Sequence, residues 1–350
     1  MADNSRIIFT KSIDPWWNLA GEEYLLDRVE PGQCILYLWQ NNDTVVIGRN
    51  QNPWRECRAQ ELEADGGKLA RRLSGGGAVF HDIGNINFTF VVSKELYNLD
   101  KQLDVILNAV RSFGIGAQRS GRNDIIADGR KFSGNAFCFR KRSAYHHGTI
   151  LVSSDFDKLS KYLQVSEEKM RYKGVQSVQS RVVNLSELSQ DITVERMADA
   201  LIDSFRASYG SAAPVEKCVT VDKEGKEALE ELYCKYLSWT WRYGEAPKFD
   251  VTIEKRFDWG SVELGIKLEG GIVSSLAAYS DALDEEYIAL LPELFRGCHF
   301  DSKKLAQRLR QSVCEQVAAI EPEAADEPLG SDLRRTMALD LAQWVESKKF

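Results

Sequence analysis

The stretch Arg71-Arg72-Leu73-Ser74-Gly75-Gly76-Gly77-Ala78-Val79-Phe80-His81-Asp82 is the most informative part of this chain for fold and function. Glycine has no Cβ, so its backbone can lie against a ligand with its N–H groups facing that ligand. Backbone N–H groups and guanidinium forks suit phosphate oxygens. The stretch therefore predicts a nucleotide-binding segment. A tight turn or a close chain crossing is the alternative use of three glycines, and neither the phosphate-binding loop pattern nor the dinucleotide fingerprint is matched.

The two arginines that precede the glycines are expected to have different surroundings. In an extended segment, the side chains of Arg71 and Arg72 point to opposite faces. We therefore expect one of them to face the glycine-lined pocket and the other to be a solvated charge.

A second informative stretch runs from Ile125 to Gly134. The pair Asp128-Gly129 between β-prone residues predicts a two-residue hairpin. If the following strand alternates, Lys131 and Ser133 share one face. An inward lysine needs an anionic partner, because burial of an unpaired charge is costly. A phosphate or a carboxylate would supply it, whereas an exposed lysine would belong to the ordinary surface.

Composition indicates an ordinary globular protein, and the length is sufficient for two domains. The chain has 350 residues, 43% of them hydrophobic and 28% charged, with a net charge of −7. An acidic balance disfavours a nucleic-acid surface, which normally needs a basic excess. Seven scattered cysteines without a CxxC pair disfavour a zinc site and are typical of reduced cytosolic thiols. No apolar run near the N-terminus suits a signal peptide or a membrane span, so we expect a cytoplasmic protein.

Periodicity predicts a mixed α/β first part and a smaller second part. We expect Asp14 to cap a helix that begins at Pro15, and the strands at 34–39 and 44–47 to pair. Glycine and proline near 241–247 suggest a boundary, giving domains 1–246 and 247–350. Further strands are expected at 7–10, 86–92, 145–152, 249–253, 261–268 and 271–278, helices at 53–65, 103–113, 194–209, 283–294, 302–319 and 331–346, and a mobile loop at 167–180.

The adjacent histidines His146 and His147 could suggest a metal site. Neighbouring residues on a strand point apart, however, and cannot easily share one ion. No third ligand stands nearby in the sequence, so we expect packed, hydrogen-bonded histidines and no structural metal site.

Several blocks in order resemble the lipoate–protein ligase A family over nearly the whole chain. The similar segments are 14–20, 44–54, 71–82, 84–85, 120–124, 131–134, 146–149, 173–178, 180–182, 184–185 and 239–244. Such an ordered set is far more specific than any one block. Leu73 departs from the family pattern, which often has serine there, so this chain lacks a hydroxyl group at that position.

The resemblance implies an α/β (α+β) catalytic fold shared with biotin–protein ligases and related to class II synthetases, with a small C-terminal α+β accessory domain. It implies that lipoate and ATP, with Mg²⁺, give lipoyl-AMP, from which the lipoyl group passes to a lysine of an acceptor lipoyl domain. Acceptors of this kind are the E2 subunits of 2-oxoacid dehydrogenases and the glycine cleavage H protein. The catalytic lysine falls on Lys131. The implied ATP- and lipoyl-AMP-binding residues are Arg72, Ser74, Gly75, Gly76, Gly77, Ala78, Val79, Phe80, Asn85, Asp124, Ser133, Gly134, His147, Gly148, Lys173, Val178 and Arg181.

Other functions remain open at this point. Within the same fold, an octanoyl or lipoyl transferase could use a pre-activated donor, and a biotin–protein ligase would use another acid. Outside enzymes, the alternatives are a non-catalytic adenylate-binding sensor and a protein-interaction module. The intact Arg72, Asn85 and Lys131 argue against lost catalysis.

Overall fold

The computed structural model describes residues 4–121, 123–164, 182–243, 250–319 and 331–348. Internal contacts divide the chain into two units. The first comprises residues 1–47, 53–73 and 78–244, and the second comprises 48–52, 74–77 and 245–350.

The first unit is built on an eight-stranded sheet with the order β11-β1-β2-β6-β10-β9-β8-β7. The pairs that β1 makes with β2 and β11 are parallel, and all other pairs in the sheet are antiparallel. The strands are β1 (Ser5–Phe9), β2 (Cys34–Trp39), β6 (Asn85–Ser93), β7 (Ala117–Ser120), β8 (Asp124–Ala127), β9 (Arg130–Phe139), β10 (Ser143–Leu151) and β11 (Val215–Glu216).

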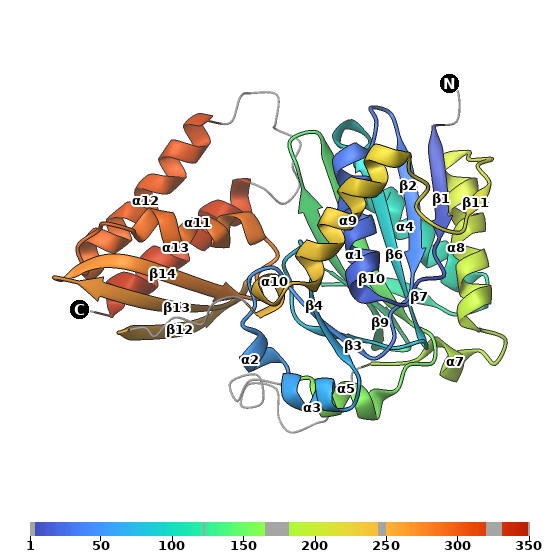
Figure 1. The fold of residues 1–350 in the computed structure, drawn as a ribbon, viewed down its shortest axis with the longest axis horizontal. Helices are drawn as coiled ribbons and strands as arrows, with labels where there is room; N and C mark the ends of the chain where they lie inside the picture. The colour runs from blue at the N-terminus through green and yellow to red at the C-terminus, as the bar shows by residue number, and fades with distance from the viewer. Residues whose placement is uncertain (1–3, 122, 165–181, 244–249, 320–330, 349–350) are drawn as a thin grey trace. The chain divides into compact units, whose positions relative to one another are not determined.

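Helices cover both faces of this sheet (Figure 1). Phe88 and Phe90 of β6 pack in one apolar cluster with α4 (Leu99–Arg111) and α8 (Val194–Tyr209). Val91 points to the other face and joins a cluster with α1 (Pro15–Arg28) and α9 (Lys223–Leu237). The two-residue period of a strand therefore separates two cores.

Helix α1 begins as the sequence predicts. The side chain of Asp14 accepts hydrogen bonds from the backbone N–H groups of Trp16 (2.9 Å) and Trp17 (3.2 Å), and Pro15 occupies the first helical position. These contacts satisfy N–H groups that have no partner inside the helix.

The predicted pairing of 34–39 with 44–47 is wrong. The second segment is β3 (Thr44–Ile47), which pairs with β4 (Lys68–Arg71) and β5 (Val79–His81) in a separate sheet. Asp43 adopts the left-handed conformation (φ 38°), and the whole of β3 is buried. The turn at Asp43 directs the chain away from the large sheet. Burial of the side chains on both faces of β3 then stabilises it in the smaller, three-stranded sheet.

The helix predicted over 53–65 is two helices, α2 (Pro53–Glu56) and α3 (Ala59–Ala64). Between them Cys57 forms a β-bridge with Leu163, and Arg58 N donates to Tyr162 O at 2.9 Å. Tyr162 ends α5 (Phe156–Tyr162). Backbone groups that bond to another segment cannot continue the helical ladder.

The hairpin predicted at Asp128-Gly129 is confirmed. Both residues have positive φ (50° and 71°), as this kind of turn requires. A bulge follows in β9: Lys131 faces Ile126 and Ser133 faces Ile125, so Phe132 is the extra residue. Phe132 is fully buried in the core, which anchors the strand directly beside Lys131.

The carboxyl-terminal part of the second unit joins a three-stranded antiparallel sheet to three helices. The strands are β12 (Val251–Phe257), β13 (Gly260–Glu269) and β14 (Ile272–Ser280). The helices are α11 (Glu285–Phe295), α12 (Ser302–Ala319) and α13 (Ser331–Ser347). They share one apolar core with the sheet. None of the helices in the described ranges has the length and apolar character that a bilayer crossing needs.

Candidate active site

Lys131 lies beside a carboxylate at the start of β9. Its Nζ is 2.6 Å from Oδ1 of Asp124, and each side chain is 37% exposed. A Cβ on Gly134 would lie 2.9 Å from the same Nζ. The side chain of Lys131 therefore packs against Gly134, where a larger residue would displace it. Lys131 is thus partly exposed and paired with a carboxylate of the protein itself, and its contact with a substrate anion stays a prediction.

Two glycines let β9 and β10 approach closely behind this lysine. A Cβ on Gly148 would lie 2.6 Å from Gly134 O and 2.7 Å from Cζ of Phe88. Gly134 N donates to Oγ1 of Thr149 at 3.3 Å. Ser133 is buried, and its hydroxyl has no partner among the described residues. Side chains at 134 and 148 would displace the strands that carry Lys131.

A cross-brace of asparagines holds the segment before β8 against β9. Asn135 N and Nδ2 both donate to Asn123 O, at 2.8 and 2.9 Å, and Asn123 Nδ2 donates to Asn135 O at 3.2 Å. Asn135 Oδ1 lies 2.8 Å from Nε2 of His146, whose Nδ1 lies 3.2 Å from Gln102 Oε1. Burial, reinforced by the charge of His147, lowers the pKa of His146 to about 3. The packed role expected for His146 is confirmed.

His147 belongs to a buried polar chain on the opposite face. Its Nδ1 lies 2.8 Å from Oε1 of Glu22, which also accepts from Oγ1 of Thr89 at 2.7 Å. Oγ1 of Thr89 in turn accepts from Nε1 of Trp39 at 3.0 Å. Glu22 is 1% exposed, and a polar group buried at such a depth requires hydrogen-bond partners.

Glu22, Thr89 and Trp39 were not predicted from the sequence. A signal for Glu22 existed. It stands three residues after Leu19 and four before Leu26, on the apolar stripe of α1. An acid on a buried stripe indicates a specific polar partner, although the partner itself cannot be read from the helix.

Both arginines before the glycines are buried, and the solvated charge expected for one of them is wrong. Arg71 donates from Nε to Trp241 O and from Nη2 to Arg242 O, both at 2.8 Å. These carbonyls lie in α10 (Trp239–Tyr243), where helix-end oxygens lack intrahelical partners. Arg72 donates from Nη1 to Val46 O at 3.1 Å. Tertiary contacts from a helix 170 residues away therefore replace water around Arg71.

The glycine segment makes a close chain crossing. A Cβ on Gly48 would lie 2.2 Å from Gly76 O, and Gly76 has a positive φ of 84°. Ser74 is fully buried, and its carbonyl accepts from Arg49 N at 2.9 Å. The crossing explains part of the glycine requirement, alongside the predicted ligand contact.

The residues that flank the glycines are partly core residues. Leu73, at the position that departs from the family pattern, is buried in the cluster that contains α1. Phe80 lies in β5 and packs against Tyr162, with ring centroids 5.7 Å apart. Val79 is half-buried in the same strand, and Ala78 precedes it. Side chains at 73 and 80 thus help fix the backbone on either side of the segment.

Asn85 supplies a buried oxygen at the start of β6. Its Nδ2 donates to Asn87 Oδ1 at 3.0 Å, and Asn87 Nδ2 donates to Trp39 O at 3.3 Å. Asn85 Oδ1 has no hydrogen-bond partner among the described residues. This oxygen is an acceptor suited to a ligand donor, a water or a cation.

The structure brings some of the predicted site residues together and leaves others unplaced. Lys131, Ser133, Gly134 and Gly148 share two paired strands with Asp124 beside them. Lys173, Val178 and Arg181, together with the loop expected at 167–180, lie outside the described residues. In the described part, no cluster of three histidine, cysteine or acidic side chains could hold a metal ion.

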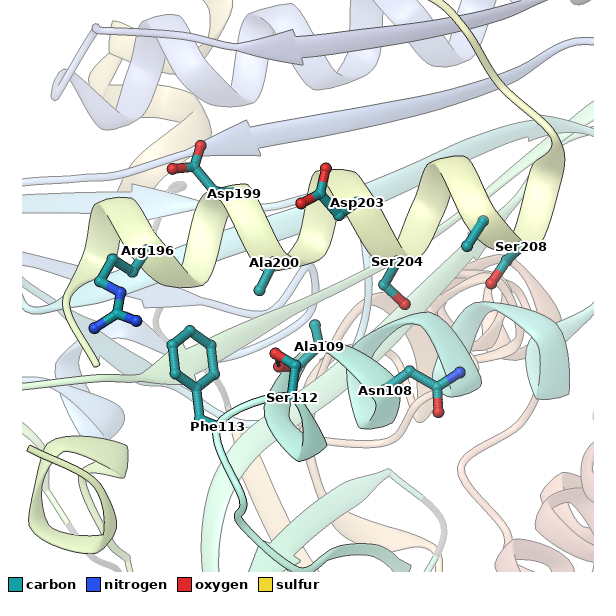
Figure 2. Close-up of a pocket in the computed structure, with 11 residues that line it drawn as sticks. Asn108, Ala109, Ser112, Phe113, Arg196, Asp199, Ala200, Asp203, Ser204 and Ser208 are labelled. Atoms are coloured by element: carbon teal, nitrogen blue, oxygen red, sulfur yellow. Dashed lines mark hydrogen bonds between the residues drawn. The ribbon is translucent and has the colours of Figure 1, made fainter. Parts of the chain in front are cut away.

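A surface pocket of about 460 Å³ lies between α4 and α8, away from the residues described above. Figure 2 shows Phe113 and Arg196 close together at one end, with Asp199 and Asp203 pointing away from α4. The pocket contains none of the predicted site residues. Its aspartates would repel phosphate groups, which argues against a nucleotide there.

Comparisons with known proteins identify the family of this chain. The lipoyl protein ligase A/B catalytic domain model matches residues 14–206, and the bacterial lipoate protein ligase C-terminus model matches residues 246–325. A lipoate-protein ligase A from Psychrobacter cryohalolentis is 41% identical over 301 residues, covering 85% of this chain and 89% of the relative.

Solved structures give the same result. Plasmodium falciparum LipL1, in complex with lipoate, has a TM-score of 0.78 at 29% identity and covers 96% of this chain and 99% of its own. A lipoate-protein ligase A bound with ATP has a TM-score of 0.59 at 25% identity, covering 69% of this chain and 99% of its own. The chain is therefore an enzyme of the lipoate–protein ligase A family.

Proposed function

We propose that this enzyme activates lipoate with ATP and then transfers the lipoyl group to a lysine of an acceptor lipoyl domain. The observation that carries the proposal is Lys131, held 2.6 Å from Asp124 above the glycine-lined strands. Domains 1–246 and 247–350 would be the catalytic and accessory parts, working in the cytoplasm.

In the first step a carboxylate oxygen of lipoate attacks the α-phosphorus of ATP, and pyrophosphate leaves. Two anions must approach each other, so a fixed cation lowers the barrier by proximity and electrostatic stabilisation. The ammonium of Lys131 would contact both anions. In the second step the amine of the acceptor lysine attacks the acyl carbon, and AMP leaves with its charge stabilised by the same ammonium.

Mg²⁺ would accompany the nucleotide. The buried oxygen of Asn85 is a hard oxygen donor of the kind that this ion prefers. Because the described residues offer no cluster of three candidate ligands, phosphates and water would complete its shell.

The acceptors we propose are the E2 lipoyl domains of 2-oxoacid dehydrogenases and the glycine cleavage H protein. A related archaeal system from Thermoplasma acidophilum pairs a bipartite lipoate protein ligase with its E2 lipoyl domain, and that ligase is 28% identical to this chain. Incubation with ATP, lipoate and each purified acceptor, followed by intact mass, would show which acceptor is modified.

Pyrophosphate release tests the activating step. Purified enzyme with ATP and Mg²⁺ should release pyrophosphate when lipoate is added, and not when biotin is added. Release with neither acid would contradict the proposal and favour a transferase that uses a pre-activated donor, or a sensor. Release with biotin alone would indicate a biotin–protein ligase.

A further inference from the structure

Two tryptophan side chains cover the open edge of β4, the strand that precedes the glycine segment in the chain. In its sheet β4 is an edge strand, paired with β3. The N–H group of Arg72 points toward β3 and donates to Ile47 O at 3.0 Å. Backbone groups of successive residues in a strand point to opposite sides, so the carbonyls of Leu69 and Arg71 face the open edge. Edge carbonyls of this kind need partners from outside the sheet.

An indole N–H group donates to each of these two carbonyls. Nε1 of Trp16, in α1, donates to Leu69 O at 3.0 Å, and Nε1 of Trp241, in α10, donates to Arg71 O at 2.9 Å. Both tryptophans are half-buried, and a lysine ammonium lies over each ring, at 4.7 Å and 4.4 Å from the centroid. The two contacts are therefore alike in chemistry and lie two residues apart on one strand.

The peptide unit between Arg71 and Arg72 is held at both ends. Its carbonyl accepts from Trp241, and its N–H group donates to Ile47 O. A peptide unit is planar, so hydrogen bonds on its two opposite sides fix its orientation. The guanidinium of Arg71 strengthens the contact with α10, because it donates to Trp241 O and Arg242 O. The backbone direction at Arg72 is therefore set by α10 on one side and by β3 on the other.

We propose that Trp241 is a positioning residue for ATP binding and acts through Arg72. This inference rests on the proposed function and on the ATP contact expected for Arg72. The side chain of Arg72 is buried and donates to Val46 O at 3.1 Å, so its direction depends on the backbone from which it starts. A misplacement of about 1 Å in a binding group can cost about 10²-fold in rate. Trp16 bonds two residues earlier and should support only the fold.

Two identical substitutions separate positioning from stability. Trp241→Phe and Trp16→Phe each keep an aromatic ring in place and remove one indole N–H group from a carbonyl of β4. Calorimetry with ATP alone, and separately with lipoate alone, would measure both affinities for each variant. Urea titration would measure the stability of the same two variants.

We expect both variants to have lower urea midpoints than wild type, by similar amounts. Trp241→Phe should also bind ATP about tenfold more weakly, the equivalent of one hydrogen bond, with lipoate affinity within about threefold of wild type. Trp16→Phe should keep both affinities within about threefold of wild type.

A double-mutant cycle tests the route through Arg72. Arg72→Met removes the guanidinium but keeps an unbranched side chain, and it should weaken ATP binding by itself. In that background Trp241→Phe should cause no further loss of ATP affinity, because the group that it positions is gone. Losses that multiply would mean that Trp241 acts on ATP by another route, which overturns the inference.

The outcomes separate the two proposals. If the unmodified enzyme fails to bind ATP, the proposed function fails. If it binds ATP and Trp241→Phe behaves like Trp16→Phe, or loses ATP and lipoate equally, only the assignment of Trp241 is overturned.

Nitrogen NMR of the unmodified, tryptophan-labelled enzyme provides a readout that does not depend on a variant remaining folded. The chain has 8 tryptophans, and the Trp241 signal can be assigned by through-space contacts with the ring of Tyr236, 5.6 Å away. Because coupling is reciprocal, ATP should slow hydrogen exchange at Nε1 of Trp241 and leave Nε1 of Trp16 unchanged. Equal changes at both indoles, or no change at Trp241, would overturn the inference.

Discussion

Lys131, which follows the hairpin turn in β9, forms an ion pair of 2.6 Å with Asp124 at the start of the paired strand β8. The pair links a turn that can be recognised in the sequence to the chemistry proposed for the site. The turn and the buried Phe132 bulge position the backbone of Lys131, and the contact with Asp124 positions its ammonium group. A lysine held in this way needs little reorganisation when anionic substrates bind.

Replacing Lys131 by alanine should abolish most of the activity without unfolding the protein. Loss of one preorganised donor typically costs about 10²–10³ in rate, and we expect at least this loss in both half-reactions. Lys158→Ala is the matched control, because Lys158 also forms an exposed ion pair, 2.8 Å from Asp43. Near-wild-type pyrophosphate release by Lys131→Ala would contradict the assigned role.

Asp124 should act on the reaction mainly through Lys131. We expect Asp124→Asn to lower lipoyl-AMP formation by about tenfold, a middle value for coupled neighbours. The double variant Asp124→Asn/Lys131→Ala should then be no slower than Lys131→Ala alone. If the double variant instead lost the product of the two single losses in single-turnover assays, the two side chains would act independently.

Gly148→Ala should destabilise the first unit. The new Cβ would meet Gly134 O at 2.6 Å, and backbone there cannot move without shifting β9. Overpacking of this kind costs about 1–3 kcal/mol in the free energy of unfolding. Gly116→Ala is the control, because its Cβ would meet nothing within 4 Å. Equal urea midpoints for the two variants would show that the strands tolerate a wider spacing.

His146→Gln should reduce the slope with which the free energy of unfolding decreases as the pH falls below 6.5. The native pKa of His146 is about 3 against an ordinary 6.5, so the unfolded chain binds the extra proton as the pH falls between these values. Stability from the neutral ring is complete above pH 6.5 and is lost towards pH 3, by about 1.4 kcal/mol per pH unit. His147 is the titratable neighbour that contributes to lowering the pKa of His146, and Gln102 and Asn135 are its neutral partners.

Urea titrations of wild type and His146→Gln from pH 8 to pH 4 would measure this difference in slope. Parallel curves would mean that the ring is not held neutral in the folded protein.

The sequence determined the parts of this protein that depend on neighbouring residues. The cap at Asp14, the turn at Asp128-Gly129 and the period-two strands follow from local hydrogen bonds, backbone sterics and alternation. The ordered family blocks likewise predicted the family to which the chain belongs.

The contacts between distant segments depend on the three-dimensional fold and could not be predicted from local sequence. The fold assigned β3 to a second sheet, covered Arg71 with carbonyls of α10, and placed Glu22 against His147. It also joined His81 to Asn41, and Asn41 to Asn18, through buried side-chain contacts. Each of these contacts joins residues far apart in the chain, and the free energy of pairing a buried polar group depends on what surrounds it in space, which local sequence does not encode.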